Sequence, residues 1–315
     1  VKYSYLLTGT ILMNKPDDLY TPLKITGAQE SNFTQFKQRY NVYGGFGGWT
    51  VVGHKHLDEL QAKLSSVSKR LKKEEVLKEL PPKTYKEEYI EMGAKQSKIY
   101  KDVLADIITN IDNISLSVDP LAQMIRLRQA TADTSILSST VKESVKFDRA
   151  LELINDIIES GESVIVFSNW ETVISNFMAY LKKNKLESAV VTGKITDRES
   201  ELKKFSTKDS CHVVLGTVGA LGTGYTLNKA SNVIFLDEPW TKAVKEQAED
   251  RCHRIGQKNN VTIYTLICKD TIDERVHSIV KKKGAMGDAL VDKQYDLKNP
   301  KVLSFLLTGE GTLDK

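Results

Sequence analysis

Five short apolar runs recur along the second half of the chain, and they constrain its fold more than any other feature. Helical or loop-like segments separate these runs, which occupy residues 163–167, 189–192, 212–215, 232–236 and 261–266. Strands that are apolar at successive positions are buried on both faces, as in a parallel sheet covered by helices. The sequence therefore predicts an α/β fold with one doubly wound parallel sheet, over roughly residues 140–280.

Residues 31–135 have a different composition, which predicts a mainly helical insertion and not a second sheet. The stretch 40–53 is rich in glycine and aromatic residues, whereas 57–64 and 85–108 have helical patterns. A basic run between the two helical patterns contains Lys69, Arg70, Lys72 and Lys73. This run is as consistent with a solvated helix face as with binding to phosphates.

Charge, cysteine usage and hydropathy narrow the possible partners. The net charge of +4 and the pI near 8.7 are mildly basic, which is compatible with a nucleic-acid partner without requiring one. The three cysteines form no CxxC pair, so we expect free thiols in a reducing compartment and no metal site. No apolar run is long enough to span a membrane and no signal peptide opens the chain, which predicts a cytoplasmic protein without a membrane partner.

The stretch 247–257 places one glutamine and two arginines at helical spacing. Gln247, Arg251 and Arg254 follow the i, i+4, i+7 pattern of one helix face. A guanidinium group is always charged and meets phosphate oxygens through a planar fork of donors, so two of them suit a triphosphate. Taken by itself, the spacing is more often that of a solvated charged face.

Two further segments come close to nucleotide-binding motifs without matching them. Residues 219–226 nearly match the GxxxxGK[ST] loop, but Tyr225 occupies the lysine position, so the ammonium contact with phosphate is missing. A glycine turn without a ligand is an alternative for this loop. Asp237 and Glu238 follow a strand, where they could hold magnesium or be ordinary solvated carboxylates.

The string Gln-Ala-x-x-Arg-x-His-Arg-Ile-Gly-Gln at residues 247–257 closely resembles the last motif of the SWI/SNF-type, helicase-like DNA translocases of superfamily two. Other segments resemble further motifs of that family in the same order, namely 7–10, 40–53, 164–168, 192–205, 217–224 and 237–242. A threonine within the glycine loop is similar to the annealing-helicase subgroup. The resemblance covers nearly all of residues 1–285.

In this family two RecA-like lobes enclose ATP, and the resemblance places the chain across the second lobe. It implies that residues 1–30 end the first lobe, 31–135 form a helical protrusion, 136–285 form the RecA-like C-terminal lobe and 286–315 form a tail. The chain has no GxxxxGK[ST] motif and no convincing Asp-Glu box, so ATP and Mg²⁺ would be held mainly by an absent N-terminal lobe. The start at Val1, on a strand-like run, also suggests a piece of a longer protein.

The resemblance also implies roles for individual residues and partners. Arg251 and Arg254 are expected as arginine fingers, and Gln247 is expected to couple the nucleotide to lobe closure. Gly222 and Gly224 would let the loop backbone approach phosphate. The expected partners are that N-terminal lobe and double-stranded DNA, which implies a nucleoid location, or a nuclear one in a eukaryote. Contacts to DNA are expected from Ser168, Thr217, Ala220, Lys69, Arg70, Lys72 and Lys73.

The expected activity is that of one half of a DNA-dependent ATPase that translocates on double-stranded DNA. The isolated chain should be inactive, because an arginine finger without a P-loop has no held substrate. A stand-alone nucleic-acid-binding module or a protein-interaction module without ATPase activity are the alternatives. A strand-separating helicase would have the same sequence features.

Overall fold

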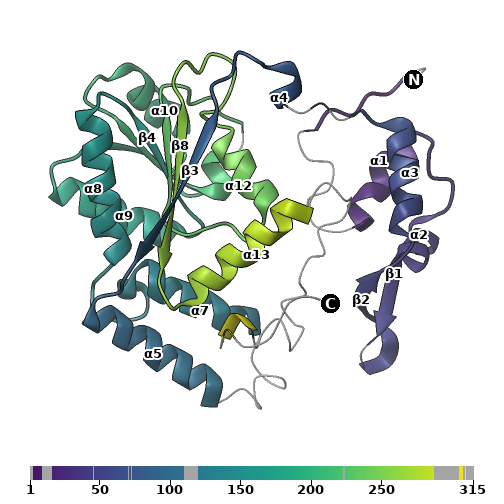
Figure 1. Cartoon of the computed structure of the whole chain (residues 1–315), viewed down its shortest axis with the longest axis horizontal. Coiled ribbons are helices and arrows are strands. Elements are labelled where there is room, and N and C mark those ends of the chain that lie inside the picture. The colour runs from purple at the N-terminus through teal and green to yellow at the C-terminus, as the bar shows by residue number, and fades with distance from the viewer. Residues whose placement is uncertain are drawn as a thin grey trace. The chain divides into compact units, whose positions relative to one another are not determined.

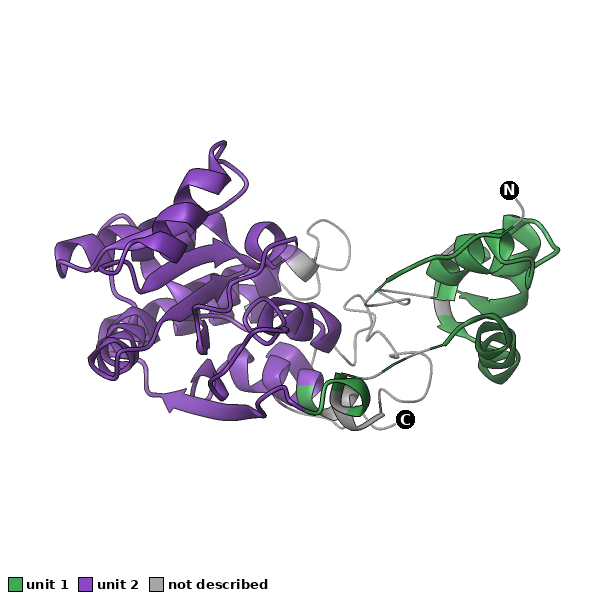
Figure 2. Cartoon of the chain, turned by 90° about the horizontal axis from the view of Figure 1, so that it is seen from above, with its two compact units in different colours: residues 1–78, 281–296 green, residues 79–280, 297–315 purple. Residues whose placement is uncertain are grey.

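The computed structural model of this 315-residue chain describes residues 3–8, 16–44, 46–69, 71, 73–109, 120–222, 224–286, 305–307 and 309. The chain divides into two units, residues 1–78 with 281–296 (unit 1) and residues 79–280 with 297–315 (unit 2), as Figure 2 shows. Unit 2 contains the predicted sheet, and unit 1 contains the first part of the predicted insertion.

Unit 2 is built on a six-stranded sheet, as far as the described residues show, with the strand order β3-β8-β7-β4-β6-β5 (Figure 1). Every pair of neighbouring strands is parallel. The strands are β3 (Lys83–Ile90), β4 (Val164–Ser168), β5 (Ser188–Val191), β6 (Val213–Thr217), β7 (Asn232–Phe235) and β8 (Val261–Cys268). Strands β4 to β8 lie on the five apolar runs, so the predicted parallel sheet is confirmed.

Helices cover both faces of this sheet because successive side chains of each strand point to opposite sides. In β4, Val164 and Val166 pack with one layer of helices, whereas Ile165 and Phe167 pack with the other, and all four side chains are fully buried. The first layer contains α8 (Val145–Glu159) and α9 (Glu171–Lys183), and the second contains α10 (Arg198–Thr207), α11 (Val218–Leu221) and α12 (Lys242–Glu249). Because helices cover both faces of the sheet, strands β4 to β8 carry apolar residues on both sides.

Strand β3 differs from the sequence-based prediction, which placed a helix over residues 85–108. Helix α5 begins only at Ala94, and residues 83–90 pair in parallel with β8 at the edge of the sheet. An edge strand is partly open to solvent, so its side chains are mostly polar and carry no apolar alternation. The pairing also brings residues 79–135 into unit 2, whereas the sequence assigned them to the protrusion.

Unit 2 contains further helices. They are α5 (Ala94–Thr109), α7 (Pro120–Ala132), the 3-10 turn η3 (Thr134–Ile136) and α13 (Ile272–Met286), whose residues from 281 onward are assigned to unit 1. The Gln96 side-chain amide on α5 donates to the carbonyl oxygens of Ala130 and Thr131, at 3.0 Å each. The Tyr100 hydroxyl accepts from the Ile272 backbone N–H at 2.9 Å, which joins α5 to the start of α13.

Unit 1 is mainly helical, as predicted, but it also contains an antiparallel hairpin, so a small second sheet is present that the sequence did not predict. Asn32 and Gln35 form a capping box at the start of α2. Gly47, with a φ of 80°, lies in the turn of the hairpin. The elements are η1 (Pro16–Leu19), α1 (Tyr20–Ile25), α2 (Phe33–Tyr40), β1 (Asn41–Gly44), η2 (Phe46–Gly48), β2 (Thr50–His54), α3 (Leu57–Val67) and α4 (Lys73–Val76). The core is formed by Leu19, Leu23, Phe36, Tyr40, Leu60 and Leu64.

Candidate functional site

The carboxyl ends of three neighbouring strands, β6, β4 and β7, meet at one edge of the sheet, where ligands of doubly wound folds bind. Ser168 at the end of β4 and Thr217 at the end of β6 are opposite each other in register. The chain that continues from β7 carries Asp237, which accepts from the Ser168 hydroxyl and, at 2.9 Å, from the backbone N–H of Asn169. Residues from three separate predicted motifs therefore lie together.

The Ser168 side chain is fully buried, although the sequence predicted it as a contact to DNA. Its hydroxyl donates to Asp237 and accepts from the backbone N–H of Trp170 at 3.1 Å. Because the hydroxyl is used inside the protein, it is not available to DNA in this structure. Thr217 and Ala220 are half-buried, and their contacts with DNA stay predictions.

Asp237 and Glu238 are both buried, so neither is a solvated carboxylate at a strand end. Burial raises the pKa of Asp237. Burial also acts to raise the pKa of Glu238, but His277 and Lys245 outweigh it, and the net pKa is lowered. Lys245 Nζ lies 2.5 Å from Glu238 Oε1, and His277 Nδ1 lies 2.8 Å from Oε2. With both carboxylates engaged in this way, they do not fit a magnesium site.

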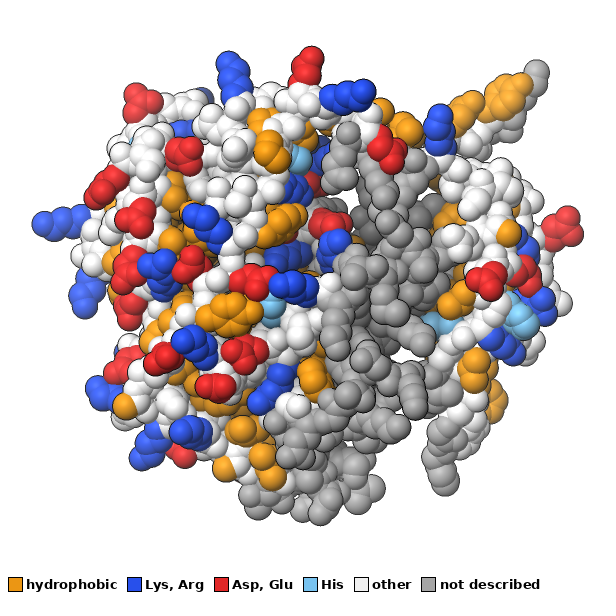
Figure 3. Space-filling model, viewed as in Figure 1, with side chains coloured by type: hydrophobic (Ala, Val, Ile, Leu, Met, Phe, Trp, Pro, Cys, Tyr) orange, Lys and Arg blue, Asp and Glu red, His pale blue; other side chains and the backbone are white. Residues whose placement is uncertain are grey.

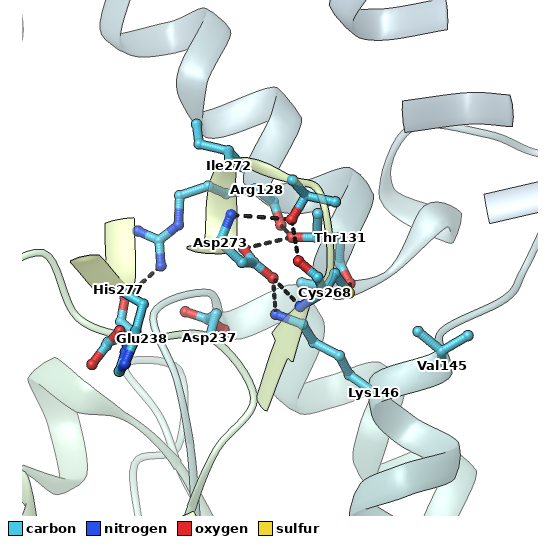
Figure 4. A network of polar contacts seen from close by, with 12 residues as sticks. Arg128, Thr131, Val145, Lys146, Asp237, Glu238, Cys268, Ile272, Asp273 and His277 are labelled. Carbon is cyan, nitrogen blue, oxygen red and sulfur yellow. Dashed lines mark hydrogen bonds and ion pairs between the residues drawn. The ribbon is translucent and has the colours of Figure 1, made fainter. Parts of the chain in front are cut away.

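Arg128, on helix α7, contacts the same strand-end segment from inside the protein (Figure 4). Its side chain is among the largest that are fully buried, and its Nη2 donates to the carbonyl oxygen of Glu238. The guanidinium lies 4.4 Å from the ring centroid of Trp240 and 5.3 Å from that of Trp170, within the range of a cation–π interaction. No pattern in the sequence indicated this supporting role of Arg128.

The glycine loop follows β6, and two of its glycines have local structural reasons. A Cβ atom on Gly222 would lie 2.2 Å from the carbonyl oxygen of Val218, far inside contact distance. Gly224 has a φ of 84°, a conformation that other residues rarely adopt. The turn itself therefore explains both glycines, and their approach to phosphate stays a prediction.

Arg251 and Arg254 lie in turns beyond helix α12, which ends at Glu249, so the prediction that they share one helix face with Gln247 is wrong. The backbone winds more tightly after the helix. The N–H of Arg251 donates to the carbonyl oxygen of Ala248, three residues earlier, and the N–H of Arg254 donates to that of Cys252, two residues earlier. This winding changes the directions in which the two arginines project.

Both guanidinium groups nevertheless reach the same point of the glycine loop. Arg251 Nη1 and Arg254 Nη1 donate to the carbonyl oxygen of Tyr225, at 3.3 Å and 3.4 Å. Arg254 also donates to the Thr226 hydroxyl at 3.0 Å, and Arg251 Nε donates to the carbonyl oxygen of Gln247 at 3.1 Å. The structure thus joins the glutamine, the two arginines and the glycine loop. The carbonyl oxygen of Tyr225 is a backbone atom, and no sequence signal could have identified it.

Two positive charges lie side by side here, and the nearby Asp250 carboxylate offsets the charge of Arg251 only in part. Within the described part of the chain, no ion pair joins Arg251 or Arg254 to an acidic side chain. Burial and then the charge of Arg254 lower the pKa of Arg251. An anion with several oxygens, such as a phosphate group, would relieve this repulsion and match the planar donors of both side chains.

The described members of the basic run, Lys69 and Lys73, belong to unit 1. Lys69 is exposed, and Lys73 is half-buried at the start of α4. Arg70 and Lys72 lie outside the described residues. On the face shown in Figure 3, basic and acidic side chains of the described residues are interspersed, so charge of one sign does not dominate it. Contacts between the basic run and DNA stay a prediction.

The cysteines and the other potential metal ligands among the described residues do not form a second candidate site. All three cysteines are buried free thiols, and burial raises the pKa of Cys252 and of Cys268 to about 12. The described residues contain no group of three or more His, Cys, Asp or Glu that could hold a metal ion. In the same residues, no helix has both the length and the apolar character needed to cross a membrane.

Two family models match successive parts of the chain. A model of the SNF2-related domain matches residues 1–142, and a model of the helicase conserved C-terminal domain matches residues 145–256. An uncharacterized ATP-dependent helicase of Mycoplasma genitalium is 30% identical over 290 residues, which cover 88% of this chain and 27% of the relative. The SWI/SNF-related matrix-associated actin-dependent regulator of chromatin subfamily A-like protein 1 of Xenopus laevis is 30% identical over 286 residues, covering 88% of this chain and 28% of the relative. The chain thus spans only about a quarter of the length of these relatives.

Solved structures share the fold at low sequence identity. The SWI2/SNF2 ATPase core domain of Sulfolobus solfataricus has a TM-score of 0.61 at 22% identity, covering 92% of this chain and 61% of that chain. The same core, solved in complex with double-stranded DNA, has a TM-score of 0.57 at 22% identity, covering 89% and 61%. The C-terminal part of the Fun30 ATPase domain has a TM-score of 0.59 at 23% identity, covering 72% and 96%.

Proposed function

Because the chain belongs to the SWI/SNF-type family of helicase-like ATPases, we propose that it is the C-terminal half of an ATP-dependent double-stranded DNA translocase. Arg251 and Arg254 would complete an ATP site whose phosphates and Mg²⁺ are held mainly by an N-terminal lobe. One observation carries this proposal: the two guanidinium groups share the Tyr225 carbonyl oxygen and have no carboxylate partner in the described residues.

The chemistry of phosphoryl transfer explains what such a pair would do. Negative charge in the transition state is spread over the oxygens of the transferred phosphoryl group. Guanidinium groups that are already held at one point stabilise this charge without reorganising during the reaction. Gln247, whose carbonyl oxygen accepts from Arg251, would couple the nucleotide to closure of the lobes. Gly222 and Gly224 have no side chain that would obstruct a phosphate at those two positions of the loop.

Magnesium and DNA would be held by different parts of the protein. Asp237 and Glu238 are already paired inside the chain, so the metal would be held by carboxylates of the N-terminal lobe. Closing and opening of the lobes would shift the contacts to the DNA backbone in step with hydrolysis. Those contacts would come from the loop after Ser168, from Thr217 and Ala220, and from Lys69, Arg70, Lys72 and Lys73. Such a partner implies a nucleoid location, or a nuclear one in a eukaryote.

The test is ATP hydrolysis, with and without double-stranded DNA, by a polypeptide that contains this chain together with its N-terminal lobe. Arg251→Ala and Arg254→Ala should each lower kcat by about 10³-fold or more, while affinity for DNA is largely kept. Arg126→Ala is the matched control, because Arg126 is an exposed arginine on helix α7. This variant should keep the kcat of the unaltered protein.

Each of the other outcomes would count against a different part of the proposal. DNA-stimulated turnover by residues 1–315 alone would contradict the need for an N-terminal lobe. An unchanged kcat in both arginine variants would contradict their role as arginine fingers. DNA binding without any ATPase activity in the longer polypeptide would favour a stand-alone nucleic-acid-binding module.

A further inference from the structure

The turn that carries the two arginines, residues 250–257, is attached to the last residue of helix α12. The carbonyl oxygen of Glu249 accepts hydrogen bonds from the backbone N–H groups of Cys252 and His253, both at 3.2 Å. Arg251 lies within the two turns that these hydrogen bonds close, and Arg254 is the next residue after them. The position of Glu249 therefore sets the starting point from which both arginines extend.

The carboxylate of Glu249 is in turn held by the edge strand β3. Lys83 Nζ lies 2.9 Å from Glu249 Oε2 and 3.0 Å from Asp250 Oδ1. The Tyr85 hydroxyl donates to the same Glu249 oxygen at 3.0 Å. The Glu249 side chain is only 1% exposed, so these donors replace the water that the carboxylate has lost.

Two further contacts join the residues just before β3 to the middle of the turn and to the start of β8. His253 Nε2 lies 2.7 Å from the carbonyl oxygen of Pro81, which places the proton of this contact on Nε2. The backbone N–H of Val261, where β8 begins, donates to the carbonyl oxygen of Pro82 at 3.2 Å. Residues 81–85 thus contact the last residue of α12, the beginning and middle of the arginine turn, and the start of β8.

We propose that Lys83 is a positioning residue for the arginine fingers and forms, with Pro81 and Tyr85, an edge clamp that holds the arginine turn against the glycine loop. The inference rests on the proposed function of Arg251 and Arg254. It connects two segments that are far apart in the chain, because Lys83 lies in the part matched by the SNF2-related model and the arginines lie in the part matched by the helicase C-terminal model.

The edge clamp also gives the connection between the units a role. Residues 79–82 follow directly on unit 1 along the chain and lead into β3. A movement of this connecting segment would reach the arginine turn through Pro81 and Lys83, and the start of β8 through Pro82. The arginines would then respond to the state of the segment that precedes them.

The test uses the polypeptide that joins this chain to its N-terminal lobe, and compares Lys83→Met with Lys83→Arg. Lys83→Met should lower the DNA-stimulated kcat by about 100-fold, as expected when a catalytic group is misplaced by roughly 1 Å, and should change KM for ATP little. Lys83→Arg keeps the charge and should restore most of the kcat. The matched control is Lys269→Met, because Lys269 pairs with Glu91 at the other end of the β3–β8 pair, at 3.1 Å.

A mutant cycle separates positioning from general stability. Once Arg251→Ala and Arg254→Ala together have removed both fingers, Lys83→Met should cause little further loss of kcat, because it acts through those two groups. A loss from Lys83→Met that is as large in this background as in the unaltered protein would overturn the proposal. Tyr85→Phe removes a single hydrogen bond to Glu249 and should lower kcat several-fold, which keeps the test decisive if Lys83→Met does not fold.

The two proposals fail in different ways in this experiment. If Arg251→Ala and Arg254→Ala leave kcat unchanged, the proposed function is refuted. If these variants lose activity while Lys83→Met and Tyr85→Phe keep it, only the edge clamp is refuted.

Discussion

The buried ion pair between Lys146 and Asp273 predicts a large loss of stability when only one partner is removed. Lys146 Nζ lies 2.6 Å from Asp273 Oδ2, and the two side chains are 0% and 7% exposed (Figure 4). Lys146→Met keeps most of the side-chain volume but leaves the Asp273 carboxylate buried, with the Thr131 hydroxyl and the Cys268 N–H as donors. Breaking a buried pair in this way should lower the free energy of unfolding by about 3–5 kcal/mol.

Tryptophan fluorescence can follow unit 2 separately in this assay. Trp170 and Trp240 belong to unit 2, whereas Trp49, the remaining tryptophan of the chain, belongs to unit 1. In a Trp49→Phe background, intrinsic fluorescence therefore reports the unfolding of unit 2 alone. For a unit of this size, the expected loss corresponds to a fall in Tm of about 6–20 °C.

Two comparisons make the result interpretable. Lys95 and Glu143 form an ion pair at 3.2 Å with side chains 72% and 38% exposed, so Lys95→Met should cost about 1 kcal/mol or less. Combining Lys146→Met with Asp273→Asn should recover most of the stability, because neither of these two positions then carries a buried charge. A loss in Lys146→Met no larger than that in Lys95→Met would refute the reasoning.

Two further predictions concern the glycine loop and the buried histidine. Gly222→Ala places a methyl group 2.2 Å from the Val218 carbonyl oxygen, so the loop must shift. DNA-stimulated kcat should fall about tenfold or more, and an unchanged kcat would count against a role of this loop in the ATP site. Burial acts to lower the pKa of His277, but Glu238 and Glu87 outweigh it and raise the pKa. The stability that His277 contributes is therefore complete below about pH 6.5 and is lost as pH rises through the folded-state pKa. His277→Gln should flatten the decline of Tm across that window in calorimetry, and a variant with the same pH profile as the unaltered protein would contradict this.

The sheet could be predicted from the sequence wherever its strands are covered on both sides. Strands β4 to β8 are largely apolar because each has helices on both faces. Strand β3 could not be recognised, because it carries few apolar residues, unlike β5 at the other edge of the sheet. Its composition is typical of a helix, and its pairing with residues 261–268 is not visible in the local sequence. Its place is decided by a partner distant in sequence, which no local pattern contains.

The sequence singled out Arg251 and Arg254 as candidates but did not predict their arrangement. They were chosen by spacing and resemblance, and their meeting at the Tyr225 carbonyl depends on a turn that helical periodicity did not predict. A usable signal for Lys146 was present, because it follows the i, i+4, i+7 spacing of the buried face of α8 together with Ala150 and Leu153. A lysine in that register indicates a buried charge, although the identity of its partner does not follow from the pattern.

The pairing of β3 with β8 has a consequence for how the protein is made on the ribosome. Strand β3 leaves the ribosome about 170 residues before its partner β8 begins, which corresponds to roughly ten to thirty seconds of synthesis. During this interval its hydrogen-bonding groups have no native partner, which is the state in which strands aggregate. The lysine and glutamate side chains of residues 83–90 disfavour such association. The polar composition that concealed this strand in the sequence therefore protects the nascent chain until its neighbour is synthesised.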